Sequence, residues 1–166
     1  MLTRRSFLQS AALTSALPLL GSAPVWGAPS ERLTIGFFGV GTMGTGHLRA
    51  LVRRDDVEVV AICDVVQEQI DNAVKIVNEQ YAERKKSGKT TDPLTYGDFR
   101  ELLANPAIDA VVIGTPDHWH TAMMLDALRC GKSVYCEKPL SLTVAEGRLL
   151  TQAAAKSPHV VQVGTQ

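Results

Sequence analysis

The residues of this chain that are best suited to chemistry begin with a glycine-rich segment behind an apolar run. The segment is Gly39-Val40-Gly41-Thr42-Met43-Gly44. With this spacing the first glycine permits a tight turn, the second lets the backbone approach a pyrophosphate, and the third lets a helix pack closely on the preceding strand. That helix, which begins near Thr42 and Met43, would present unpaired N–H groups to the phosphates. The segment predicts a phosphate-binding turn, and a glycine-rich turn without a ligand is the alternative.

An acidic residue favours the first of these interpretations. Asp64 lies twenty residues after Gly44 and directly follows the strand-like run 57–63. In dinucleotide-binding units a carboxylate at this place accepts hydrogen bonds from the adenosine ribose. Its charge would repel a 2′-phosphate, and Val65 and Val66 follow it where a basic residue would accommodate one. The pattern therefore predicts NAD, rather than NADP, as the cofactor.

Two further polar segments each follow a strand-like run. One is Gly114-Thr115-Pro116-Asp117-His118-Trp119-His120, and the other is Glu137-Lys138-Pro139-Leu140. Ligands of open α/β sheets bind outside the carboxyl ends of the strands. We therefore expect these two segments and the glycine-rich turn to meet in one crevice.

The elements that must position these segments alternate between strand and helix, which predicts an α/β fold with a doubly wound, Rossmann-type parallel sheet. About six strands are expected, at residues 33–38, 57–63, 94–96, 110–113, 133–136 and 160–163. Helices are expected at residues 42–54, 67–86, 99–103, 118–130 and 143–157. Asp98 with Glu101 is typical of a capping pair, and Asp117 is predicted to cap the helix that follows it.

The first 28 residues are predicted to be an export signal and spacer. The start, Thr3-Arg4-Arg5-Ser6-Phe7-Leu8-Gln9, precedes a moderately apolar run at 10–20, as in twin-arginine signals. That run is too short to span a bilayer. The Tat machinery is therefore an expected partner and the periplasm or exterior the expected location, whereas an ordinary Sec signal or an uncleaved amphipathic tail are alternatives. Cleavage after Ala23 and cleavage near Gly27 or Ala28 both remain open.

Composition excludes several other classes. The 166 residues carry 17 basic and 17 acidic side chains, a balance that suggests neither a nucleic-acid partner nor an anionic membrane surface. The three cysteines, Cys63, Cys130 and Cys136, form no Cys-x-x-Cys pattern. Cys63 and Cys136 are expected to be buried apolar side chains of the core. His118 and His120 diverge if they lie in a helix, so no metal site is predicted.

Together these segments resemble the Gfo/Idh/MocA oxidoreductases, a family that includes glucose–fructose oxidoreductase and inositol dehydrogenase. The residues that carry the resemblance are Gly39-x-Gly41-x-x-Gly44, Asp64, Thr115-Pro116-Asp117-x-x-His120 and Glu137-Lys138-Pro139. The similarity runs from about residue 33 to the end. The segment around 115–120 and the final Val163-Gly164-Thr165-Gln166 resemble the exported, sugar-acting branch of the family.

The resemblance implies roles for the two later segments. Lys138 would lie near the nicotinamide and polarise the reacting hydroxyl or carbonyl, unless it is only a surface lysine before a turn. Glu137 would contact the cofactor or orient Lys138, and Pro139 would fix the loop, with a cis peptide as one way to do so. Thr115 and Pro116 would contact the cofactor. His118, Trp119 or His120 would line the nicotinamide pocket, with His120 as the catalytic candidate, or His120 would only make hydrogen bonds in the first helical turn.

In this family a substrate domain with a catalytic histidine follows the nucleotide domain, so we expect residues 33–166 to be the NAD(P)-binding domain without its C-terminal partner. The leading hypothesis is a nicotinamide-dependent oxidoreductase acting on a sugar or polyol, forming a homo-oligomer at full length. The second is an NAD-dependent glycoside hydrolase with a redox-neutral cycle. The third is a truncated chain that only binds nucleotide.

Overall fold

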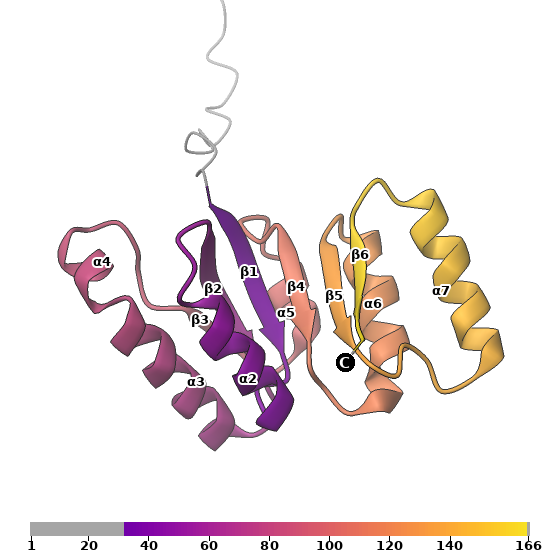
Figure 1. Cartoon of the computed structure of the whole chain (residues 1–166), viewed down its shortest axis with the longest axis horizontal. Helices are drawn as coiled ribbons and strands as arrows, with labels where there is room; N and C mark the ends of the chain where they lie inside the picture. Colours follow the sequence, from indigo (N-terminus) through magenta and orange to yellow (C-terminus); the bar gives the residue numbers. More distant parts are fainter. Residues whose placement is uncertain (1–31, 166) are drawn as a thin grey trace, which may run out of the picture. The chain divides into compact units, whose positions relative to one another are not determined.

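The computed structural model describes residues 32–165, so the predicted export signal lies outside the described residues (Figure 1). Six parallel strands form one sheet in the order β3-β2-β1-β4-β5-β6. The strands are β1 (Leu33–Phe38), β2 (Val57–Cys63), β3 (Leu94–Tyr96), β4 (Ala110–Ile113), β5 (Ser133–Glu137) and β6 (Val161–Gly164). The order reverses between β1 and β4, which creates a crevice at the carboxyl ends of these two central strands. The predicted doubly wound α/β fold is confirmed.

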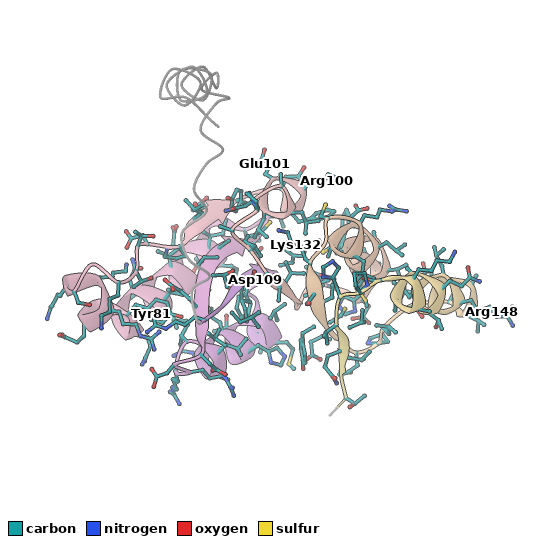
Figure 2. The ribbon with its side chains drawn as sticks, turned by 90° about the horizontal axis from the view of Figure 1, so that it is seen from above. Tyr81, Arg100, Glu101, Asp109, Lys132 and Arg148 are labelled. Carbon is teal, nitrogen blue, oxygen red and sulfur yellow. The ribbon has the colours of Figure 1, made fainter. Side chains whose placement is uncertain are left out.

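The helices cover both faces of the sheet. They are α2 (Thr42–Leu51), α3 (Gln67–Gln80), α4 (Ala82–Lys86), α5 (Phe99–Leu103), the 3-10 turn η1 (Asp117–Trp119), α6 (His120–Arg129) and α7 (Val144–Lys156). Helices α2 and α3 pack against one face, whereas α5, α6 and α7 pack against the other. Figure 2 shows this division, with Arg100 and Glu101 of α5 on one side of the sheet and Tyr81 on the other.

The core consists of two apolar layers, one on each face of the sheet. In β1 the neighbouring side chains Phe37 and Phe38 are both completely buried, Phe37 against α2 and α3 and Phe38 against α5 and α6. Successive side chains of a strand point to opposite faces, so a continuous apolar run such as residues 110–113 is what a central strand requires. The run forms β4, as predicted, between β1 and β5.

The predicted helix at 67–86 is interrupted at Tyr81, whose backbone leaves the helical conformation and separates α3 from α4. The Tyr81 ring is completely buried, and its hydroxyl accepts a hydrogen bond of 3.1 Å from the Val59 amide of β2. The strand register between β1 and β2 shifts close to Val59. A buried hydroxyl needs a partner, and this contact coincides with the interruption of the helix.

Of the two predicted helix caps, the structure bears out Asp98 and not Asp117. Asp117 does not cap a helix, because a 3-10 turn begins after Pro116 and α6 begins only at His120. The Asp98 carboxylate accepts from the Arg100 amide at 2.9 Å and caps α5 as expected. The reciprocal capping box forms elsewhere, between Thr143 and Glu146 at the start of α7.

A buried lysine joins two segments at the amino ends of β4 and β5, opposite the crevice. The Lys132 side chain is almost inaccessible, and its Nζ donates to the carbonyl oxygens of Asn105 (2.9 Å) and Ile108 (2.7 Å). Burial lowers the pKa of Lys132 below its ordinary value. The two bonds tie the segment before β4 to the start of β5, and Figure 2 shows Lys132 and Asp109 in this central region. Lysine is rarely buried without such partners, so Lys132 serves the fold.

The cysteines should differ sharply in reactivity. Burial raises the pKa of Cys63 and of Cys136 to about 12, whereas Cys130 is exposed. Since the thiolate is the reactive form, we expect a thiol reagent at pH 8 to modify Cys130 quickly. Cys63 and Cys136 should react only on unfolding. Mass spectrometry of the labelled protein would identify the fast site. Rapid labelling of Cys63 or Cys136 in the folded chain would contradict the predicted burial.

Candidate functional site

The glycine turn (residues 39–44) depends on close backbone contacts that only glycine permits. Gly39 has φ +77°, and a Cβ atom there would lie 2.9 Å from the Gly114 carbonyl group. A Cβ atom on Gly44 would lie only 2.0 Å from the Gly39 carbonyl oxygen. The end of β1, the start of α2 and the loop after β4 therefore touch through backbone atoms. These are the roles that the spacing predicted for the first and third glycines.

The second glycine of the turn has open space around it. A Cβ atom on Gly41 would meet no protein atom within 4 Å. Gly41 is also the N-cap of α2, no side chain caps the helix, and its first turn contains no acidic residue. The free N–H groups and the positive dipole end of α2 therefore face an unobstructed position, which suits a pyrophosphate.

Valine at position 41 is expected to block this position without disturbing the fold. Its branched side chain would project into the space from which a pyrophosphate approaches. We therefore expect the dissociation constant for NAD to rise about thirtyfold, which corresponds to a loss of about 2 kcal/mol of binding free energy. The melting temperature without NAD should change by only a few degrees. Calorimetric titration with NAD measures the effect, and Gly46→Val provides the control because a Cβ there also meets no protein atom within 4 Å. Equal affinities in the two variants would contradict the predicted phosphate position.

Asp64 is attached to the glycine turn. Its Oδ2 accepts from the Val40 amide at 2.8 Å, and its Oδ1 accepts from the Val66 amide at 3.0 Å. Each carboxylate oxygen has two lone pairs, so each retains one acceptor position for a ribose hydroxyl. The carboxylate can therefore fix the turn and still take the role predicted for it.

Asp64 also lines a cavity of about 310 Å³ at the carboxyl ends of β1, β2 and β4, which we call the adenosine cavity. Its wall consists of Phe38, Gly39, Cys63, Asp64, Val65, Gly97, Asp98, Phe99, Arg100, Thr115, Pro116, Trp119 and Met123. The predicted residues Thr115 and Pro116 thus meet Asp64 and the glycine turn in one place. The cavity lies where the fold predicts the adenosine half of a dinucleotide.

Sequence patterns missed Phe99 and Arg100 in the wall of this cavity, whereas Trp119 belongs to the polar segment 114–120 that was expected in the crevice. Phe99 and Trp119 meet edge to face with their ring centroids 6.3 Å apart, and the Arg100 guanidinium lies over the Phe99 ring at 4.6 Å. These residues belong to α5 and η1, on either side of β4 in the sequence. The Asp98 cap that starts α5 was the only local signal in this region. Planar groups of this kind suit a flat heterocycle such as adenine.

The second part of the crevice is the lysine loop, which comprises Glu137, Lys138, Pro139 and Leu140. Glu137 is 4% exposed, and its Oε1 lies 2.5 Å from His47 Nε2 on α2. The Tyr135 hydroxyl donates to the same oxygen at 3.3 Å, and the Lys138 amide donates to Oε2 at 3.2 Å. Glu137 therefore joins the phosphate-facing helix to the backbone of Lys138. His47 makes this connection across 90 residues of sequence.

The Lys138–Pro139 peptide bond is cis, one of the forms considered for this loop. The Lys138 side chain is exposed, and its Nζ makes no hydrogen bond within the described residues 32–165. Its backbone, by contrast, is held by Glu137. Lys138 is consequently a fixed attachment point for an ammonium group that is free to contact a ligand.

Glu137 should make the stability of this loop sensitive to acid. Burial raises the pKa of Glu137, but hydrogen bonds from His47, the Lys138 amide and Tyr135 outweigh it, so the pKa lies below its ordinary value. A lowered folded-state pKa stabilises the fold above the unfolded-state pKa, and this contribution is lost as the pH falls through the folded-state pKa.

The variant Glu137→Gln isolates this effect. It should lose about 1.5–3 kcal/mol of unfolding free energy at pH 7, since hydrogen bonds to charged groups have this size. The gap between the melting temperatures of wild type and variant should then narrow on acidification below about pH 4.5. Thermal unfolding monitored by circular dichroism between pH 3 and pH 7 measures this. A gap that stays constant over the range would contradict the assignment.

His120 lies behind the crevice rather than in its opening. It is 1% exposed, its Nδ1 lies 2.8 Å from the Pro139 carbonyl oxygen, and its Nε2 lies 2.9 Å from the Thr115 carbonyl oxygen. Both ring nitrogens are therefore occupied by main-chain groups. This geometry favours the second of the two roles left open by the sequence, in which His120 makes structural hydrogen bonds.

Two further classes of site can be assessed for the described part of the chain. Within residues 32–165 no three His, Cys, Asp or Glu side chains are grouped to hold a metal ion. None of the helices between these residues is long and apolar enough to cross a membrane.

Residues 33–165 match the family described as "Oxidoreductase family, NAD-binding Rossmann fold", the Gfo/Idh/MocA family. The chain belongs to this family. It is an NAD-binding Rossmann domain of the Gfo/Idh/MocA family, and the predicted cofactor, NAD, is confirmed.

Curated relatives carry glycosidase names. A "Glycosyl hydrolase family 109 protein" of Stenotrophomonas maltophilia is 34% identical over 166 residues, which cover 95% of this chain and 35% of that protein. An "Alpha-N-acetylgalactosaminidase" of Shewanella oneidensis is 40% identical over 116 residues, 70% of this chain and 24% of that protein. The chain thus spans about a third or less of the length of these relatives.

Solved structures with the same fold carry dehydrogenase names. The scyllo-inositol dehydrogenase of Lactobacillus casei, with bound NAD(H) and scyllo-inositol, superposes with a TM-score of 0.68 at 25% identity. The match covers 80% of this chain and 36% of that one. The myo-inositol 2-dehydrogenase of Lactobacillus plantarum gives a TM-score of 0.64 at 27% identity, covering 80% of this chain and 36% of that one.

Proposed function

We propose that this domain provides the cofactor half of an oxidoreductase that acts on a polyol or sugar hydroxyl group. The observation that carries the proposal is Lys138, whose exposed ammonium group has no partner within residues 32–165 while buried Glu137 holds its backbone. An ammonium group can donate a hydrogen bond to a substrate oxygen and favours negative charge on it. The inositol dehydrogenases of the same fold support the choice of substrate class.

Each part of the crevice has a separate task in this proposal. Bound NAD would supply hydride acceptance from the substrate carbon. The glycine turn and the amino end of α2 would bind the pyrophosphate, and Asp64 would bind the ribose of the adenosine half. Lys138 would hold the substrate oxygen and favour release of the hydroxyl proton. Glu137 would keep Lys138 in place, with His47 as its anchor.

Binding and turnover require separate experiments. We expect NAD at a hundredfold excess over its dissociation constant to stabilise the 166-residue chain by about 2.7 kcal/mol, with NADP giving a smaller shift. A longer protein, in which the expected substrate domain follows this domain, should then oxidise some members of a panel of inositols, sugars and sugar alcohols. The absorbance of reduced NAD is the readout. A chain that NAD does not stabilise would overturn the binding assignment, and a panel without any oxidation would overturn the substrate class.

A second candidate function is NAD-dependent hydrolysis of a glycosidic bond. The observation that favours it is the identity of 34–40% to proteins named as family 109 glycosyl hydrolases and an α-N-acetylgalactosaminidase. In such chemistry the cofactor is restored within each turnover, so no net change in its absorbance is expected. Release of nitrophenol from aryl glycosides, including N-acetylgalactosaminides, by the longer protein would support this function. No release from any of them would exclude it.

We also propose that the protein is exported by the twin-arginine pathway. The support is the sequence alone, since Arg4 and Arg5 precede an apolar run. Replacing both arginines by lysine should retain the protein in the cytoplasm while leaving NAD binding unchanged. Cell fractionation tests this, and equal export of both forms would contradict it.

A further inference from the structure

We propose that His120 is a positioning residue that sets the lysine loop against the adenosine cavity, so that a dinucleotide can occupy both halves of the crevice at once. The inference rests on the proposed function, because it assigns the lysine loop to the nicotinamide half. His120 itself would touch neither substrate nor cofactor.

The geometry places the His120 ring between two segments of the crevice. Its Nε2 lies 2.9 Å from the carbonyl oxygen of Thr115, which lines the adenosine cavity. Its Nδ1 lies 2.8 Å from the carbonyl oxygen of Pro139, the residue directly after Lys138. Both contacts are to main-chain atoms, so the ring fixes the paths of the two segments rather than the orientation of single side chains.

The imidazole ring of His120 is difficult to replace by another side chain. A carbonyl oxygen only accepts hydrogen bonds, whereas an imidazole ring carries a potential N–H group on each of two opposite sides. With one ring proton one of the two bonds can form, and with two protons both can form. A phenyl ring fills the same space without donating at all, and the amide of glutamine donates from one nitrogen only.

The lysine loop is also held from the other face of the sheet. The His47 side chain of α2 binds Glu137 at 2.5 Å, which fixes the start of the loop. His120 of α6 fixes the loop two residues later, at Pro139. Lys138 lies between these two attachments, so loss of the His120 bonds releases one side of the lysine while the glycine turn and Asp64 stay intact.

The proposal predicts a selective loss in binding. ADP-ribose carries the adenosine, pyrophosphate and second ribose of the cofactor but lacks the nicotinamide, so it probes mainly the part of the crevice that does not involve the lysine loop. In His120→Phe we expect NADH to bind about tenfold more weakly, which is the size of one lost buried hydrogen bond. The affinity for ADP-ribose should stay within about twofold of wild type.

The experiment is a fluorescence titration of the 166-residue chain with NADH, followed by displacement with ADP-ribose. His159→Phe is the matched control, because His159 lies just before the amino end of β6, whereas the crevice lies at the carboxyl ends of the strands. His120→Gln is the second variant, and circular dichroism checks that each one folds. A selective loss of NADH affinity in the His120 variants, absent in the control, would support the proposal.

Three other results would overturn it. Equal losses for NADH and ADP-ribose would assign His120 to the general stability of the crevice, and unchanged affinities would deny it any role in binding. Failure of both His120 variants to fold would assign it to folding. Failure of the proposed function is distinguishable, since a wild-type chain that binds neither ligand would contradict the cofactor site itself.

Discussion

Alanine at position 44 is expected to destabilise the domain by about 3 kcal/mol or more. The added Cβ would lie 2.0 Å from the Gly39 carbonyl oxygen, a rigid backbone atom that cannot rotate away. Overpacking of this kind typically costs about 1–3 kcal/mol and exceeds this range where no side chain can yield. For a domain of this size we expect a fall in melting temperature of about 10 °C or more.

Gly46→Ala is the matched control for this prediction. It lies two residues further along α2, is exposed, and has no protein atom within 4 Å of an added Cβ. Alanine in an exposed helix interior should raise stability by up to about 1 kcal/mol. The melting temperature of Gly44→Ala should therefore lie below that of wild type, and the melting temperature of Gly46→Ala above it. Equal melting temperatures would show that the backbone contact between Gly44 and Gly39 is not the reason for glycine at position 44.

Replacing Lys138 by alanine is expected to reduce turnover of the longer protein by about a hundredfold or more. Groups that transfer a proton or hold a reacting oxygen in the transition state contribute about 10²–10⁴-fold. The fold should be almost unaffected, since the Lys138 side chain is exposed and makes no hydrogen bond within the described residues. NAD-induced thermal stabilisation should also persist, because the glycine turn and the adenosine cavity remain intact.

The contrast between turnover and NAD binding makes this prediction specific. Steady-state kinetics with a reactive polyol gives the turnover, and thermal unfolding with and without NAD gives the binding. Lys89→Ala, an exposed lysine before β3 and remote from the crevice, serves as the control. Unchanged turnover in Lys138→Ala would remove the lysine from the mechanism, and a parallel loss of NAD binding would assign it to cofactor affinity instead.

Local sequence patterns were sufficient for the sheet and the glycine turn. Strand β1, the turn and strand β2 follow one another along the chain, and each is specified by its own apolar run or glycine spacing. The roles of Gly39 and Gly44 follow from steric rules that apply to any strand–turn–helix. For the same reason Asp64 could be placed next to the turn, which it binds through Val40.

Contacts between distant parts of the chain could not be predicted in this way. His47 and Glu137 are separated by 90 residues, and nothing near His47 indicates that α2 faces the end of β5. Tyr81 continues the helical apolar pattern of α3, yet the bond of its hydroxyl to β2 coincides with the break in the helix. His120 looked like a catalytic candidate because a histidine in a polar loop has the right chemistry. Its burial depends on how two loops fold over it.

The two apolar layers of the core have a consequence for how the sequence can change over time. Among the described residues, Val77 of α3 belongs to one layer and Leu102 of α5 to the other, and no buried residue is common to both. Effects of substitutions that share no partners add with little coupling. Pairs of substitutions on opposite faces should therefore show almost no epistasis, so the α2–α3 face can diverge among homologues without compensating changes beneath α5 and α6. The crevice, whose loops draw on both faces, is where correlated changes should concentrate.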